Sequence, residues 1–116
     1  MRNTDTRKKG IDFENKVSCY LESVGYVVLE RNYRYYRFSE VDIIALDGCV
    51  VVAIEVKGIS HFWDDECISE KVGSDKISKI RYALISYCRE QKLEDRQMRV
   101  DVIAVKGKKI THYKNI

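Results

Sequence analysis

Three charged residues, Asp42, Glu55 and Lys57, interrupt segments that are otherwise apolar. Charges in buried strands cost free energy unless they are paired or bind a metal ion. Carboxylate oxygens favour Mg²⁺ or Mn²⁺ over zinc. A lysine beside such a metal can contact a water molecule and lower its pKa or hold it in line for attack. Hydrolysis of a phosphodiester bond is the natural use of this chemistry.

A predicted hairpin places these residues together. Asp47-Gly48 is a strong turn signal between two β-branched, apolar segments. With these two residues as the turn, Asp42 pairs with Ala53 and Glu40 with Glu55, and paired side chains share one face of the sheet. That face carries three carboxylates and a lysine at the end away from the turn: Glu40, Asp42, Glu55 and Lys57. The other face is wholly apolar: Val41, Ile43, Ala45, Val50, Val52, Ile54 and Val56.

A structural explanation competes with the catalytic one. A cross-strand pair of glutamate and lysine at the end of a sheet is common, so a Glu-x-Lys sequence alone is a weak indication of a site. Asp42 at the matching position of the preceding strand strengthens the catalytic interpretation, as does Glu14 on a helix before it. Because three carboxylates on one face repel one another, we expect a cation among Glu40, Asp42 and Glu55.

A basic and aromatic segment precedes the hairpin. Arg31, Arg34 and Arg37 alternate there with tyrosines, and cations with planar side chains between them suit a phosphate backbone and unstacked bases. A solvated strand edge, protected by charge from pairing, explains the segment equally simply and is favoured by this pattern alone. Lys76, in the first turn of a predicted helix, opposes the helix dipole; a phosphate contact and a solvated lysine account for it equally well.

Apolar periodicity predicts the elements that position these residues. Residues 11–24 form an amphipathic helix that Gly25 ends, and a second helix starts at the N-cap Ser74. Its apolar face is Ile77, Ile80, Leu84, Ile85 and Cys88. Strands are predicted at 26–35, 40–46, 49–57, 100–105 and 110–113, with 58–73 irregular. The fold class is α/β: a single domain over residues 11–116, with a mixed sheet of α-β-β-β-α-β core flanked by helices.

Composition sets the class of protein. The chain has 116 residues, 45% hydrophobic and 34% charged, which suits one soluble domain with a core. Residues 1–10 supply the net charge of +3 and are expected to form a basic, flexible tail. Without a membrane-spanning run or an apolar leader, we expect a cytoplasmic protein with no membrane partner. The cysteines form no Cys-x-x-Cys pair and are expected to be reduced core thiols.

Several further residues are interpreted as structural. His61 and His112 have no partners at ligand spacing, which predicts surface or packing roles. Asp101 starts a strand beside Arg99 and is expected to be structural. Trp63 is expected to cap the core rather than to stack on a base.

Motifs along nearly the whole chain occur in the order of a known family. They are Glu14 with Tyr20-Leu21 and Gly25-Tyr26, Glu30-Arg31-Asn32-Tyr33-Arg34, Glu40-Val41-Asp42-Ile43-Ile44, Glu55-Val56-Lys57, Lys76, Arg99-Val100-Asp101-Val102 and a final His112…Asn115. With these motifs the chain resembles the YraN-like endonuclease family of the PD-(D/E)xK superfamily, which includes restriction enzymes and archaeal Holliday junction resolvases. Phe13 and Ser39 stand where that family usually has glycine, and no basic residue follows shortly after Lys57.

The resemblance implies a restriction-endonuclease-like fold and a Mg²⁺- or Mn²⁺-dependent endonuclease that acts on nucleic acid, DNA above all. It implies Asp42 and Glu55 as metal ligands, Lys57 as the catalytic lysine and Glu14 as a contributor through a water molecule. The expected nucleic-acid contacts are basic: Arg31, Arg34, Arg37 and Lys76. Duplex DNA, a branched junction, a single strand and RNA all fit as substrates, and junction cleavage would require the two active sites of a homodimer.

Other functions compete with this one. A module of the same fold that only binds nucleic acid should carry a broken Asp/Glu/Lys set, and here the set is intact. A secreted nuclease toxin is disfavoured by a chain that begins at Met1 without a leader; both alternatives stay open. An oxidoreductase finds no support, because the sequence has no glycine-rich phosphate loop and no reactive-cysteine motif.

Overall fold

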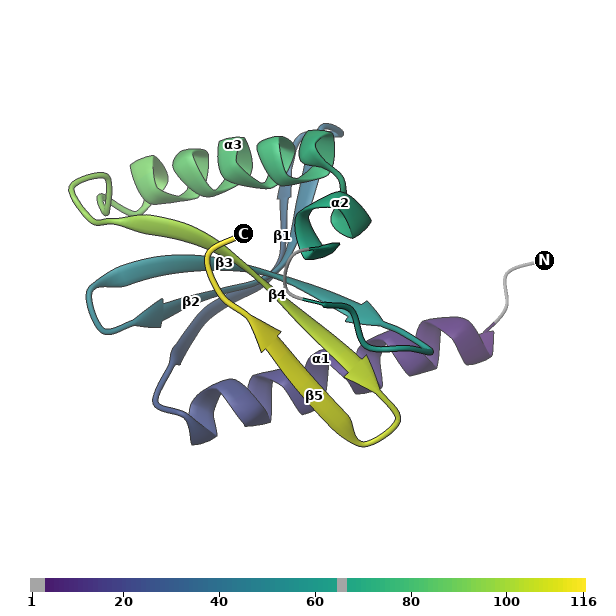
Figure 1. Cartoon of the computed structure of the whole chain (residues 1–116). Coiled ribbons are helices and arrows are strands. Elements are labelled where there is room, and N and C mark those ends of the chain that lie inside the picture. The colour runs from purple at the N-terminus through teal and green to yellow at the C-terminus, as the bar shows by residue number, and fades with distance from the viewer. Residues whose placement is uncertain (1–3, 65–66) are drawn as a thin grey trace.

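One mixed β-sheet separates two long helices (Figure 1). The computed structural model describes the backbone of residues 4–64 and 67–116 and the side chains of residues 13–64 and 67–116. Its elements follow in this order: α1 (Thr4–Ser23), β1 (Val27–Tyr35), β2 (Ser39–Asp47), β3 (Val50–Gly58), α2 (Ile68–Val72), α3 (Ser74–Glu90), β4 (Met98–Lys106) and β5 (Lys109–Tyr113). The predicted order of elements is confirmed, with α2 added in the segment that was predicted to be irregular.

The five strands lie in the order β1-β2-β3-β4-β5. The first three form an antiparallel meander, β4 runs parallel to β3, and β5 returns antiparallel to β4. A parallel neighbour requires a crossover connection, which α2 and α3 supply. The inner strands β3 and β4 are covered on both faces, which explains their nearly continuous apolar sequences. The predicted α/β fold with a mixed sheet flanked by helices is therefore confirmed.

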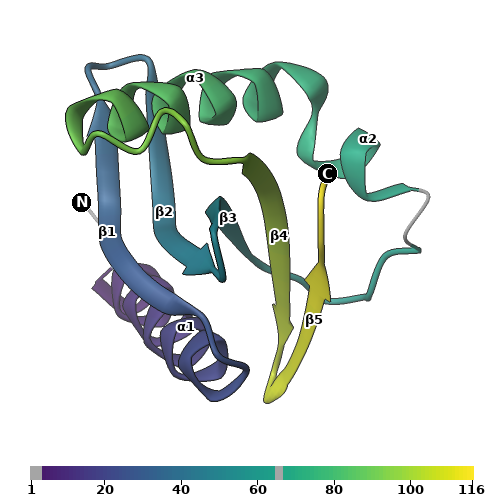
Figure 2. The ribbon, with the colours of Figure 1, turned by 90° about the vertical axis from the view of Figure 1, so that its left-hand side faces the viewer.

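The helices α1 and α3 cover opposite faces of the sheet (Figure 2). Val17 and Leu21 of α1 pack on buried strand residues: Ile43, Ala45, Val52, Ile54, Ile103 and Val105. Ile80 and Leu84 of α3 pack on the other face: Ile44, Val51, Ala53 and Val100. Because each buried aliphatic side chain contributes about 1.5–3 kcal/mol, these two clusters fix both helices against the strands.

The first helix is longer than the sequence predicts. α1 begins at Thr4 rather than at Ile11, so the helix includes residues 4–10 of the segment that was expected to form a tail. Gly10 costs about 1 kcal/mol inside a helix, too little to end one. Residues 1–3 of the predicted tail lie outside the described residues.

The buried stripe of α3 differs from the predicted one. Ile85, expected in the core, is 36% exposed, whereas Ala83 and Tyr87 are buried beside Leu84. Gly73 (φ 94°), rather than Ser74, is the N-cap residue. The stripe faces the sheet at i, i+3 and i+4 spacing, and this orientation places the first turns of α3 above the ends of β2 and β3.

No helix among the described residues is both long enough and apolar enough to cross a membrane. The four cysteines are free thiols. Cys88 is a core thiol as predicted, but the prediction is wrong for Cys19 and Cys49, which are exposed.

Candidate functional site

The β2–β3 turn begins at Gly48, one residue later than predicted, because Asp47 remains in β2 opposite Val50. Gly48 has a φ of 59°, and a type II′ turn takes glycine at its first central position. The strand pairing therefore shifts by two residues. A shift of two keeps every side chain on its face of the sheet. Continued along the strands, the observed register brings Asp42 opposite Glu55 rather than Ala53.

The ladder between β2 and β3 ends one pair before these carboxylates, at Ile43 and Ile54. Beyond it, the backbone N–H of Val56 donates a hydrogen bond to Asp42 Oδ2 at 2.8 Å. Val41, predicted to share a face with Ile43, packs instead in the cluster under α3. The orientation of β2 thus changes at Asp42, and the break in strand pairing coincides with the predicted site.

Asp42 and Glu55 line an open cavity of about 310 Å³. The remaining lining residues come from the β1–β2 turn, the start of β2 and the first turns of α3: Phe38, Ser39, Glu40, Lys76, Lys79 and Ile80. Of the predicted catalytic residues, the structure brings the two carboxylates together in this cavity, whereas Lys57 does not line it. The cations that line it come from α3.

Lys76, rather than Lys57, is the ion-pair partner of Glu55. Its Nζ lies 3.0 Å from Glu55 Oε1, and the glutamate side chain is only 7% exposed. Burial lowers the pKa of Lys76, but the hydrogen bond to Glu55 and its charge outweigh burial and raise it, so the lysine stays charged. The helix dipole disfavours a cation at the start of a helix, and the ion pair with Glu55 compensates for that unfavourable interaction. A simply solvated Lys76 is therefore excluded.

Asp42 carries the largest electrostatic penalty of the site. Burial, followed by the negative charge of Glu55, raises the pKa of Asp42 from 3.8 to about 7. The hydrogen bond from Val56 and the charge of Lys76 lower the pKa and offset only part of that rise. The carboxyl group therefore keeps its proton to a higher pH than an ordinary aspartate, and a further cation beside it would favour the charged form.

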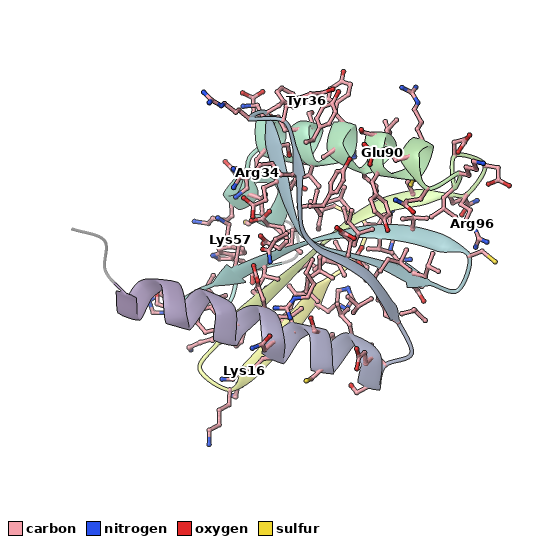
Figure 3. The ribbon with its side chains drawn as sticks, turned by 180° about the vertical axis from the view of Figure 1, so that it is seen from behind. Lys16, Arg34, Tyr36, Lys57, Glu90 and Arg96 are labelled. Carbon is pink, nitrogen blue, oxygen red and sulfur yellow. The ribbon has the colours of Figure 1, made fainter. Side chains whose placement is uncertain are left out.

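Lys57 lies two residues beyond Glu55 on β3 and is half-buried. The alternation of the strand puts both side chains on the same face. Lys57 is near enough to Lys76 to influence the pKa of that lysine. Figure 3 shows Lys57 below Arg34, on the same side of the molecule.

Glu14 of α1 is close enough for its charge to contribute to the raised pKa of Asp42. Its carboxylate accepts hydrogen bonds from Arg31 Nη2 at 3.5 Å and from Asn32 Nδ2 at 3.4 Å. Asn32 adopts a φ of 55°, a conformation that asparagine tolerates better than most residues. Arg31, predicted to contact nucleic acid, is thus paired with Glu14.

A close contact between α1 and β3 positions Glu14. A Cβ atom at Gly58 would lie 2.5 Å from Cε2 of Phe13, the neighbour of Glu14. Only glycine at this position lets the ring lie against the strand. Gly58 thus supplies the space that the Phe13 side chain needs.

Glu40 lines the cavity, but its carboxylate lies 3.4 Å from Arg34 Nη2 and is 45% exposed. Within residues 13–64 and 67–116, no three His, Cys, Asp or Glu side chains come together as a metal-binding group. Arginines engage both Glu14 and Glu40, and the ligand set that includes them stays a prediction. Asp42 and Glu55 remain as a pair. Mg²⁺ commonly binds proteins through one or two carboxylates and takes its other ligands from water and substrate phosphates, so the pair fits that ion.

The predicted basic segment borders a second open cavity of about 350 Å³. Arg34 and Arg37 line it, together with Tyr36. Both cavities share the same three residues: Phe38, Ser39 and Glu40. The cavity that Arg34 and Arg37 line therefore adjoins the carboxylate site.

A buried polar network occupies the α1 face of the sheet. Asp101 is fully buried and bonds Arg99 Nε at 3.0 Å and His112 Nε2 at 2.7 Å. Arg99 also reaches Asp47 Oδ2 at 2.8 Å, and Tyr20 OH lies 3.1 Å from the other ring nitrogen of His112. This burial and these contacts fit the structural role predicted for Asp101. The expectation for His112 is incomplete, because its ring is a hydrogen-bonded member of this network.

Sequence reasoning missed two contacts: the pair of Lys76 with Glu55 and the pair of Asp101 with His112. The available signal for the first was a lysine in the first turn of a helix, where a cation needs a compensating partner. The signal for the second was an aspartate inside an apolar strand, which needs buried donors. Trp63 packs on the core cluster that includes Tyr113, as predicted.

Known proteins are similar to this chain over almost its whole length. The model of the uncharacterised protein family UPF0102 matches residues 13–105, a range that includes all the candidate site residues. A UPF0102 protein of Sulfurihydrogenibium sp. is 41% identical over 113 residues, covering 96% of this chain and 95% of the relative. UPF0102 proteins of Persephonella marina (37% over 109 residues; 92% and 90% covered) and Syntrophus aciditrophicus (39% over 105 residues; 90% and 80% covered) are also similar. The chain belongs to the UPF0102 family.

Proposed function

We propose that the protein is a Mg²⁺- or Mn²⁺-dependent endonuclease that hydrolyses phosphodiester bonds, with DNA as the favoured substrate. We place it among the YraN-like nucleases of the PD-(D/E)xK superfamily, which the sequence motifs resemble. The observation that carries the proposal is the carboxylate pair. Asp42 and Glu55 lie at a break in strand pairing, in an open cavity, with the pKa of Asp42 raised to about 7. A purely structural site has no need to keep two like charges together.

The residues of the site have separate proposed roles. Asp42 and Glu55 would hold the metal ion, which when bound lowers the pKa of a coordinated water and neutralises phosphate charge. The backbone N–H of Val56 holds one carboxylate oxygen of Asp42 in place. The orientation of the whole carboxylate, including its second oxygen, is therefore set by a backbone contact rather than by a flexible side chain. Lys57 and Lys76 supply positive charge beside the carboxylates, where the phosphate that is cut would lie.

A module that only binds nucleic acid is the second candidate. The ion pair between Lys76 and Glu55 favours it, because one carboxylate of the pair already has a cationic partner. The raised pKa of Asp42 argues against it, since Lys76 leaves that carboxyl poorly compensated. The two candidates share a fold and a binding surface and differ in whether a bond is broken.

A cleavage assay separates the two functions. Labelled single strands, duplexes, flaps and four-way junctions of DNA, with their RNA counterparts, are incubated with the protein and EDTA, Mg²⁺, Mn²⁺ or Ca²⁺. The proposal predicts products with Mg²⁺ or Mn²⁺ and none with EDTA. Retention of the nucleic acids without cleavage in any metal would support the binding module instead.

A further inference from the structure

Three exposed aromatic side chains gather beside the carboxylate cavity. Tyr36 is 80% exposed, Tyr82 60% and Phe38 45%. The rings of Phe38 and Tyr82 lie 6.2 Å apart between centroids, and Tyr35 contacts both Tyr36 and Phe38, at 5.1 Å and 5.9 Å. We call Tyr36, Phe38 and Tyr82 the aromatic platform. It joins the β1–β2 turn to α3, and such a concentration of exposed rings is a mark of binding surfaces.

Tyr36 combines an unusual backbone conformation with an exposed side chain. Its φ is 52°, in the left-handed region that is rare for a bulky residue. The strained backbone turns an aromatic ring outward to solvent, and Figure 3 shows Tyr36 projecting from the β1–β2 turn beside α3. Backbone strain at a residue whose side chain stays exposed is characteristic of positions that bind a ligand.

Cations surround the platform. Arg34 is 71% exposed, Arg37 lies in the turn next to Tyr36, and Lys79 Nζ sits 5.6 Å from the centre of the Phe38 ring. Glu40 is the acidic residue of the second cavity, and Arg34 partly neutralises it. The charge of this surface complements a polyanion, and cations beside exposed rings suit a strand whose phosphates and bases are both accessible.

The platform is continuous with the proposed catalytic cavity. Phe38, Ser39 and Glu40 line both open cavities, so the two cavities adjoin. We call the two together the trough: Asp42 and Glu55 line one cavity, and Tyr36 and the turn arginines line the other. A strand bound along this trough would present a phosphate to the carboxylates and its neighbouring bases to the platform.

We infer that the aromatic platform binds unpaired nucleotides of a single strand, next to the bond that is cut. In a duplex the base faces are already stacked inside the helix, so exposed rings contribute nothing, whereas each unpaired base can stack on a ring. Cations bind both forms through phosphates. The position relative to the cut rests on the proposed nuclease function, but the preference for unpaired nucleotides does not.

Binding without metal tests the inference separately from cleavage. Fluorescence anisotropy in EDTA measures the affinity of the whole protein for a labelled twelve-nucleotide oligothymidine and for a labelled duplex of about the same length. The double variant Tyr36→Leu/Tyr82→Leu keeps apolar bulk and removes two rings. We expect single-strand affinity to fall about tenfold or more, from base–aromatic stacking energies, and duplex affinity to change less than about twofold.

Phe62→Leu is the matched control, because Phe62 is also an exposed ring with a lysine over it (Lys106, 5.6 Å) but lies outside the trough. It should leave both affinities unchanged. Equal losses for single strand and duplex, or no loss in the double variant, would overturn the inference and point to a protein partner for the platform. A selective loss in a protein that cleaves nothing would keep the platform and reject the nuclease.

Discussion

Lys76 Nζ lies 3.0 Å from Glu55 Oε1, so a lysine from α3 neutralises a carboxylate of β3 that is almost fully buried. The two residues come from elements that the crossover between β3 and β4 brings together. The ion pair gives the metal-free protein a cation at the carboxylates. A metal ion that binds there has to compete with, or displace, that ammonium group.

Removing the ammonium should therefore weaken the metal-free protein and strengthen its response to metal. Lys76→Met should lower the free energy of unfolding by about 1–2 kcal/mol, less than for a fully buried pair because Lys76 is partly exposed. Added Mn²⁺ should then raise the melting temperature more than in the wild type, since metal binding stabilises only the folded state. Thermal melts across a metal titration measure both effects.

Lys16→Met is the control for that variant, because Lys16 is an exposed lysine that points away from the sheet in Figure 3. It should change neither the stability nor the metal response. If Lys76→Met is as stable as the wild type and responds to Mn²⁺ in the same way, the ion pair has no electrostatic connection to the metal site.

Asp42 should make stability depend on pH. The unfolded carboxyl loses its proton near pH 3.8 and the folded one near its raised pKa of about 7, so the folded state binds more protons between these values. The metal-free wild type should therefore lose stability as pH rises through this window. Asp42→Asn keeps an oxygen for the Val56 N–H and removes the charge. It should be more stable than the wild type by at least about 1 kcal/mol at about pH 8 and show no such loss.

Metal titrations complete the comparison of Asp42→Asn with the wild type. Mg²⁺ and Mn²⁺ should stabilise the wild type increasingly with concentration, and the variant should lose most of that response. Ca²⁺ serves as a non-catalytic cation. A variant that is less stable without metal and responds to metal like the wild type would make Asp42 an ordinary structural residue.

The basic surface should bind nucleic acid through phosphates. Replacing Arg34 and Arg37 together by alanine should weaken binding to single strand and duplex alike and flatten the salt dependence by up to about two units of slope. Anisotropy titrations over a range of salt concentrations measure this slope. Arg96→Ala, on the opposite side of the view in Figure 3, is the control. An unchanged slope would move the binding surface elsewhere, with the basic N-terminal residues as the next candidate.

The network around Asp101 should stabilise the fold without taking part in cleavage. Burial raises the pKa of Asp101, but hydrogen bonds from His112 and Arg99 outweigh it and lower the pKa below its ordinary value. Its stabilisation is thus present above that ordinary value and lost as pH falls. Asp101→Asn should cost about 2 kcal/mol or more at neutral pH and progressively less in acid, measured by urea unfolding. A loss of cleavage per folded molecule would contradict a purely structural role.

Local sequence predicted most of the fold and that Asp42 and Glu55 lie together. The alternation of apolar residues gave the same face for Asp42 and Glu55 despite the wrong register, because a register error of two residues leaves faces unchanged. It misplaced Val41, which packs under α3 because the orientation of β2 changes at Asp42. The turn itself was misplaced, since Asp47 is held in β2 where its carboxylate contacts Arg99, a residue far along the chain. Turn propensity contains no information on that contact.

The cations of the site depend on tertiary structure. Lys57 is adjacent to Glu55 in the strand pattern, yet Lys76 makes the ion pair because the crossover lays the first turn of α3 over the end of β3. Glu14 and Glu40 were expected to join the metal ligands, but arginines of β1 engage both carboxylates. These ion pairs form between segments that are distant in sequence, so the periodicity and spacing of residues do not determine which partners pair.

Single-turnover cleavage tests the central claim most directly. The best DNA substrate of the panel is cut in Mn²⁺ by the wild type and by Asp42→Asn, Glu55→Gln and Lys57→Ala, with Asp95→Asn as an exposed acidic control. The account predicts a rate loss of about a hundredfold or more in each of the three site variants, retained binding in Lys57→Ala, and no loss in the control. Wild-type rates in all three site variants would contradict it.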